Sequence, residues 1–114
     1  MTKRTRKKTV PTPAPTRQMI LHEAAHAVTQ ARNVSYGEPI DDFSCTSELW
    51  DSYIARISQV RGNPDITPHD VSVMMILLKI SRLAQSPGEL DHWVDIAGYS
   101  AIGGEIASQM KCCD

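Results

Sequence analysis

Three short turns divide most of this chain into four segments whose apolar residues recur at helical spacing. The turns lie at residues 36–39, 62–64 and 86–88, and each contains a glycine and a proline. Segments of this length with helical periodicity, bounded by such turns, form helices. The sequence therefore predicts an all-α, compact bundle-like domain of about four helices.

We expect the helices at about residues 16–32, 41–61, 67–84 and 89–110. The second has the cleanest pattern, because Phe43, Trp50 and Ile57 repeat every seven residues. The third begins with Thr67 as N-cap and has Asp70 three residues later, which predicts a capping box. Its remaining residues are apolar nearly all round, as in a helix at the centre of a bundle. The fourth carries three interior glycines, which predict close approach by another helix or by a ligand.

The first sixteen residues differ from the rest in composition. Five basic side chains fall within the first eight residues, and prolines then alternate up to Pro15. Alternating prolines remove backbone donors and favour extended chain, so we expect a disordered basic tail over 1–16, a helical domain over 17–110 and a short tail over 111–114. The basic residues of the tail are Lys3, Arg4, Arg6, Lys7 and Lys8.

Charge is divided unevenly between the tail and the domain. The chain has a net charge of −1, yet the first eight residues carry +5 and the remainder −6. An acidic domain argues against a nucleic-acid-binding face on it. Only the tail is expected to contact nucleic acid, without sequence specificity, and the alternative is a terminus that merely keeps the chain soluble.

Composition also limits the cellular compartment. The longest apolar stretch, 71–78, is far shorter than the roughly 20 residues of a membrane helix, and no hydrophobic signal-peptide core appears near the start. The three cysteines are an odd number, and two of them are adjacent, which suits reduced thiols better than a disulfide framework. We expect a cytoplasmic protein.

The first helical segment contains a zinc-protease-like HExxH pattern at His22-Glu23-Ala24-Ala25-His26. At about 100° per residue, its apolar residues point away from the two histidines. A catalytic zinc needs the reverse, with ligands facing a walled cleft. The pattern therefore favours two exposed histidines over a zinc site. The apolar stripe expected to be buried consists of Ile20, Ala24, Ala27, Val28 and Ala31.

A cluster of charges in the last two helices is more informative. Asp91 and Asp95 lie one turn apart, so a cation should offset their repulsion. Lys79 and Arg82 lie one turn apart in the apolar third helix, where an unpaired charge is costly. Either the basic and acidic side chains pair with one another and fix the helix packing, or Asp91 and Asp95 bind Mg²⁺ while Lys79 and Arg82 contact phosphates.

Aromatic residues add a second element to the ligand hypothesis. Tyr36 and Trp93 are the candidates to flank a nucleotide base, and Trp50 and Tyr99 are further aromatic residues that could stack one. The alternative is that these rings belong to the core.

The sequence resembles a family of small phage and prophage helical proteins of unknown function. The resemblance spans about residues 17–107 and is carried by segments 32–39, 66–71, 75–83 and 91–99, together with Phe43 and Trp50. The same segments are distantly similar to all-α, MazG-like nucleotide pyrophosphohydrolases and to phage nucleotide-modification proteins. Those proteins bind Mg²⁺ with acidic pairs on adjacent helices. This chain lacks their EExxE helix and has Lys79 and Arg82 in its place.

The resemblance implies a phage-encoded domain in a bacterial cytoplasm that binds a nucleotide or a nucleotide-derived phosphate. One version is a Mg²⁺-dependent pyrophosphohydrolase-like protein. The alternative is a non-enzymatic protein that sequesters a host nucleotide signal or otherwise counteracts host defence, for which the interior glycines would permit a homo-oligomer.

Overall fold

The computed structural model describes residues 11–31 and 36–111. Its elements follow in the order α1 (Arg17–His26), the π-helical turn η1 (Ala27–Ala31), α3 (Pro39–Arg61), α4 (Pro68–Gln85) and α5 (Leu90–Lys111). No strand occurs among these residues, so the prediction of an all-α chain of four helices is confirmed. The predicted tail lies largely in residues 1–10, outside the described part.

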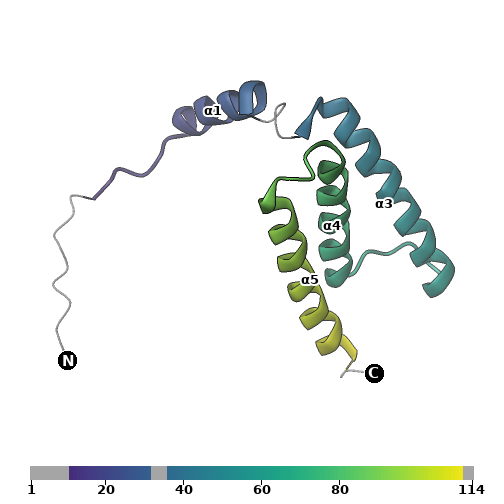
Figure 1. Ribbon diagram of the computed structural model, residues 1–114. Helices are drawn as coiled ribbons and strands as arrows, with labels where there is room; N and C mark the ends of the chain where they lie inside the picture. The colour runs from purple at the N-terminus through teal and green to yellow at the C-terminus, as the bar shows by residue number, and fades with distance from the viewer. Residues whose placement is uncertain (1–10, 32–35, 112–114) are drawn as a thin grey trace.

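Helix α4 is the centre of the packed part. It runs beside α5 along most of its length and crosses α3 on its other side, whereas α3 and α5 do not pack on each other (Figure 1). The sequence predicted this central position from the apolar character of residues 71–83.

The start of α4 is built as the sequence indicated. Thr67 and Asp70 form a capping box, in which the Thr67 backbone amide donates to Asp70 Oδ2 at 2.8 Å. Helix α3 ends at Gly62, whose φ of 85° lies in the left-handed region and whose amide donates to the Ser58 carbonyl. These two signals set the short connection between α3 and α4.

Only one of the three interior glycines of α5 makes the predicted close approach to another described residue. A Cβ at Gly103 would lie 2.8 Å from the Cβ of Ser72 on α4, so only glycine fits. A Cβ at Gly98 or Gly104 would meet no atom within 4 Å. These two positions therefore have no close packing contact with the residues that the structure describes.

The buried stripe predicted for the first helix is wrong. Helix α1 lies away from the other helices, and neither it nor η1 packs on α3, α4 or α5 in the described part of the chain (Figure 1). Because no partner helix covers it, α1 has no buried residue. The exposed positions include Ile20, Ala24, Ala27 and Val28, and the Ala31 side chain lies outside the described residues.

Few side chains are fully buried, and most of those are polar. Among the described residues Ile57 is the only buried apolar side chain, and Phe43, which belongs to the same seven-residue repeat, is 55% exposed. The buried polar residues are Asp42, Thr46, Asp70, Ser72, Ser81 and His92. The described helices include none that is long and apolar enough to cross a membrane.

Candidate functional site

The charged residues singled out in the sequence lie at the seam between α4 and its two neighbours. Lys79 Nζ is 2.8 Å from Asp95 Oδ2 on α5, and the lysine side chain is 12% exposed. The hydrogen bond from Lys79 lowers the pKa of the Asp95 carboxyl. The pairing between Lys79 and Asp95 considered from the sequence therefore occurs.

Arg82 pairs with a different partner from the one considered. Its Nε lies 3.4 Å from Oδ2 of Asp42, a buried carboxylate on α3. The Ser81 hydroxyl is 2.9 Å from Asp42 Oδ1 and 3.0 Å from the Asp42 carbonyl oxygen. Arg82 and Ser81 thus tie α4 to the first turn of α3, and neither aspartate of α5 is used.

Tyr36 places a ring against the same guanidinium. Arg82 Cζ lies 4.0 Å from the centroid of the Tyr36 ring, a cation–π contact. The Tyr36 ring also lies 5.5 Å from the His92 ring. His92 is 2% exposed, and its ring nitrogens make no hydrogen bond in the described part of the chain. The Tyr36 ring therefore lies against Arg82 and His92, where it positions the guanidinium and does not present an open face to a nucleotide base.

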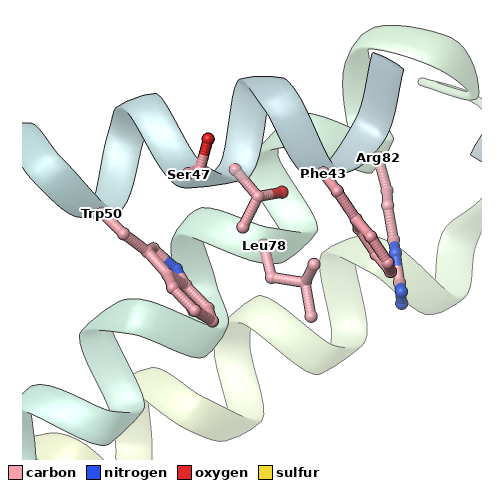
Figure 2. Close-up of a pocket in the computed structure, with 6 residues that line it drawn as sticks. Phe43, Ser47, Trp50, Leu78 and Arg82 are labelled. Atoms are coloured by element: carbon pink, nitrogen blue, oxygen red, sulfur yellow. The ribbon is translucent and has the colours of Figure 1, made fainter. Parts of the chain in front are cut away.

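Arg82 also lines a groove between α3 and α4. Figure 2 shows Phe43 beside Arg82 at one end and Trp50 at the other, with Leu78 between them on α4. Trp50 Nε1 donates to the Met74 carbonyl at 2.7 Å, which fixes the indole against α4. The groove has a volume of about 400 Å³ and is walled mainly by apolar atoms.

The guanidinium of Arg82 keeps donors available at this groove. Arg82 contacts Asp42 through Nε and Tyr36 through the face of the guanidinium, and neither terminal nitrogen donates a hydrogen bond within residues 11–31 and 36–111. A planar fork with two such nitrogens suits a carboxylate or a phosphate. An apolar, aromatic slot ending in that fork can hold a flat ring with an attached anion.

The remaining predicted site residues lie apart from this groove. Trp93 is 53% exposed, and its Nε1 donates to the Pro87 carbonyl at 2.9 Å. Asp91 is exposed in the first turn of α5. Asp91 and Asp95 offer Mg²⁺ two carboxylates, but one is already paired with Lys79, and among the described residues no three histidine, cysteine or acidic side chains are grouped to hold a metal ion. The described residues thus give Mg²⁺ an incomplete ligand set.

The HExxH histidines behave as their orientation suggested. His22 and His26 are both exposed on α1. Since α1 packs on no other helix in the described chain, no second element brings a side chain to them. Their exposure follows from the position of the whole helix, because the apolar residues on the opposite side of α1 are exposed as well.

Sequence reasoning missed Asp42 as a member of the charged seam. Asp41 and Asp42 lie in the first turn of α3, where two acidic residues suit the positive end of a helix without indicating any further partner. The burial of Asp42 depends on Ser81, which is 39 residues away in the chain. The signal in the sequence was the polar pair Ser81 and Arg82 within an otherwise apolar helix, which indicates a polar partner on a neighbouring helix.

A second buried carboxylate organises the opposite end of α4. Asp70 is fully buried and accepts hydrogen bonds from Arg61 and from the Tyr53 hydroxyl as well as from Thr67. The hydrogen bonds from Arg61 hold the pKa of Asp70 far below its ordinary range. Burial, reinforced by Asp70, raises the pKa of Tyr53 to about 12. This network is structural, because both carboxylate oxygens of Asp70 accept hydrogen bonds from residues of the chain itself.

Comparison with known proteins places residues 19–107 in a family model described as a domain of unknown function, DUF6378. The chain is 35% identical over 83 residues to the Gene 55 protein of Mycobacterium phage L5 and 31% identical over 83 residues to that of Mycobacterium phage D29. Each match covers 73% of this chain and 49% and 50% of the two relatives, so the chain spans about half the length of the curated relatives it matches. No solved structure matches the chain.

Proposed function

The chain belongs to the DUF6378 family, a domain of unknown function, and we propose from its own residues that it binds a nucleotide or a nucleotide-derived phosphate. The single observation that supports this most is the groove between α3 and α4, where two aromatic side chains and Arg82 face one space (Figure 2). A volume of about 400 Å³ is in the range of small-molecule sites.

The proposed roles follow from the contacts of each side chain. Arg82 binds the phosphate through its terminal nitrogens, while Asp42 and Tyr36 hold its orientation. Phe43 and Trp50 supply the apolar surface for the base, in place of Tyr36 and Trp93. Trp50 is held in place by its hydrogen bond to Met74, so its surface needs little reorganisation when a ligand binds.

Binding without turnover is the version that the charged seam supports. Lys79 already neutralises Asp95, so a Mg²⁺ ion bound by Asp91 and Asp95 would have to displace a lysine that is 12% exposed. We therefore propose that Lys79 contacts no phosphate while this ion pair is closed. This favours sequestration of a nucleotide signal over Mg²⁺-dependent pyrophosphohydrolysis.

A calorimetric titration tests the proposal directly. The purified chain is titrated with nucleoside mono- and triphosphates, cyclic dinucleotides and inorganic pyrophosphate, each with and without Mg²⁺. We expect saturable binding of at least one nucleotide that Arg82→Gln abolishes and Arg82→Lys only weakens, since lysine keeps the charge but not the fork. The matched control is Arg56→Gln, an exposed arginine on α3 that contacts Gln59.

Two further readouts separate the parts of the proposal. Phe43→Ala should weaken nucleotide binding and leave pyrophosphate binding unchanged, because only the base needs the ring. Release of phosphate or pyrophosphate above the level of an Asp95→Ala control would show that the chain hydrolyses the nucleotide and does not only sequester it. If no tested nucleotide binds more tightly than about 1 mM, the nucleotide proposal is wrong.

A further inference from the structure

The polar side chains on the walls of the groove between α3 and α4 leave few donors for a bound base. The Thr46 and Ser47 hydroxyls donate to carbonyl oxygens of their own helix, at 2.8 Å and 2.9 Å. The Trp50 indole N–H donates to a carbonyl oxygen of α4. Among the described residues that line the groove, only Arg82 therefore has side-chain N–H groups that donate to nothing.

The backbone of the two walls adds no donor. The groove lies within both helices, along residues 43–50 of α3 and 78–82 of α4, where each amide N–H is bonded to the carbonyl four residues earlier. What the walls offer to a base is ring surface and the oxygens of the Thr46 and Ser47 hydroxyls as acceptors. Adenine, guanine and cytosine each have an amino group and uracil has a ring N–H, so these acceptors do not distinguish the bases.

The aromatic surface of the groove is equally tolerant of different bases. Stacking on Phe43 or Trp50 depends on the face of a base, and every base has such a face. Strong discrimination requires polar groups in the site that pair with one base and stay unpaired with another. The lining residues that the structure describes include no such set, so the identity of the base should have little effect on affinity.

The anion-binding end of the groove suits a group with a single negative charge. Arg82 is the only basic side chain among the described lining residues, and its Nε already faces the Asp42 carboxylate at 3.4 Å. Its two terminal nitrogens match the two free oxygens of a phosphodiester, which share one charge, whereas a phosphomonoester has three oxygens and up to about two charges at pH 7. The chain beyond residue 8 has a net charge of −6, so further negative charge on a ligand would be repelled.

We propose that the groove selects its nucleotide by charge and not by base, and that it binds a nucleotide whose phosphate is a singly charged diester, such as a 3′,5′-cyclic mononucleotide. This inference rests on the proposed nucleotide-binding function and specifies its substrate class. Arg82 pairs with the two free phosphate oxygens, and the base lies over Leu78 towards Trp50 (Figure 2). Phe43 and Trp50 are seven residues apart, or about 10 Å along α3, which leaves room for a single nucleotide.

Calorimetric titration of the full chain without Mg²⁺ tests both parts of the proposal. The four 3′,5′-cyclic mononucleotides of adenosine, guanosine, cytidine and uridine should bind with dissociation constants within about tenfold of one another. Cyclic AMP should bind more tightly than AMP, and at least about tenfold more tightly than ATP. Arg82→Gln measures how much binding the basic residues at the start of the chain contribute on their own, and only the affinity that this variant loses is assigned to the groove.

The effect of ligand charge is also measured without changing the size of the ligand. UMP loses most of its second negative charge between about pH 7.5 and about pH 5.5, whereas cyclic UMP keeps one charge throughout. The affinity of UMP relative to cyclic UMP should therefore rise about fivefold over this range. Titration of the chain itself, for example at His69 or His92, acts on the binding of both ligands, so the ratio reports the charge of the ligand.

A variant with a second cation in the groove should change the preference. Ser47 is exposed and lines the groove, so Ser47→Lys places an ammonium near the phosphate. ATP should then gain at least about tenfold in affinity relative to cyclic AMP. The matched control is Ser52→Lys, the same change at an exposed position of α3 outside the groove, which should leave the ratio unchanged.

Failure of this inference and failure of the proposed function give different results. If no nucleotide binds more tightly than about 1 mM, both are wrong. If nucleotides bind but ATP is less than about tenfold weaker than cyclic AMP, the selection by charge is wrong. A preference for one base beyond about tenfold, or an affinity of UMP relative to cyclic UMP that does not change with pH, would likewise overturn the inference and leave nucleotide binding in place.

Discussion

Arg61 and Asp70 form a two-pronged ion pair in which Nη1 lies 2.7 Å from Oδ2 and Nη2 lies 2.9 Å from Oδ1. The arginine is in the last turn of α3 and the aspartate in the first turn of α4. Each charge also suits the helix terminus at which it lies. One residue pair therefore ties the end of α3 to the start of α4 across their short connection.

Replacing Asp70 by asparagine should remove this pair and lower the free energy of unfolding at pH 7 by about 3 kcal/mol, since Arg61 and Tyr53 lose a buried charged partner. Urea unfolding monitored by circular dichroism measures the change. Asp65→Asn, at an exposed position in the preceding loop, is the matched control and should have little effect. An equal loss in both variants would show that the Asp70 network is not special.

The same network determines acid stability. The pKa of Asp70 is depressed in the folded chain, so its contribution is fully present above the unfolded pKa of about 4 and is lost as pH falls below that value. The unmodified chain should therefore lose stability between about pH 4 and pH 2, and the loss should be smaller in Asp70→Asn. Unfolding curves recorded at half-unit pH steps measure this loss of stability in the unmodified chain and in Asp70→Asn. An equal loss of stability below pH 4 in the two chains would contradict this role of Asp70.

At the alkaline end the relevant group is Tyr53, whose pKa of about 12 exceeds the ordinary value of 10.0. A raised folded pKa stabilises the fold below pH 10, and this contribution disappears as pH rises from about 10 to 12. A spectrophotometric titration should show one phenol ionising near pH 12 that is missing in Tyr53→Phe. Tyr99→Phe is the control and should leave this late step in place.

Lys79 and Asp95 should respond unequally to removal of their charges. Lys79→Met keeps the apolar stem and leaves Asp95 with its 43% exposed side chain in contact with water. Asp95→Asn instead leaves a largely buried ammonium without its anion, so it should lower the thermal unfolding midpoint more. The double variant should recover part of that loss. If Lys79→Met proved the more damaging change, this explanation of the pair would be wrong.

Gly103→Ala should destabilise the fold by about 1–3 kcal/mol, because the new methyl would lie 2.8 Å from the Ser72 Cβ. Gly98→Ala is the comparison in the same helix, where the methyl meets nothing within 4 Å of its own chain. It should raise stability by up to about 1 kcal/mol through helix propensity. Chemical unfolding of the two variants measures both changes, and an equal loss of stability in both would contradict a close contact specific to Gly103.

Much of the local structure was predictable. The turns at Gly62 and at Ser86-Pro87-Gly88, and the capping box of Thr67 and Asp70, are contained in a few consecutive residues, and they lie where the sequence indicated. Residues 27–31 form a π-helical turn that no sequence signal announced. In the charged seam, the need of Lys79 for a partner was predictable from its apolar surroundings, and Asp95 was among the partners considered.

By itself the sequence determined that the chain is helical, where α4 begins, where α3 ends, and that Lys79 needs a partner, because capping, periodicity and the cost of burying a charge act over short distances along the chain. Only the tertiary structure decided that Arg82 contacts Asp42, that α1 packs on no other described helix and that α5 packs on α4 and not on α3. Those outcomes depend on which helix faces meet. The packing of two helices depends on the whole surface of each. Sequence periodicity identifies the apolar face of a helix but not the helix that packs on it.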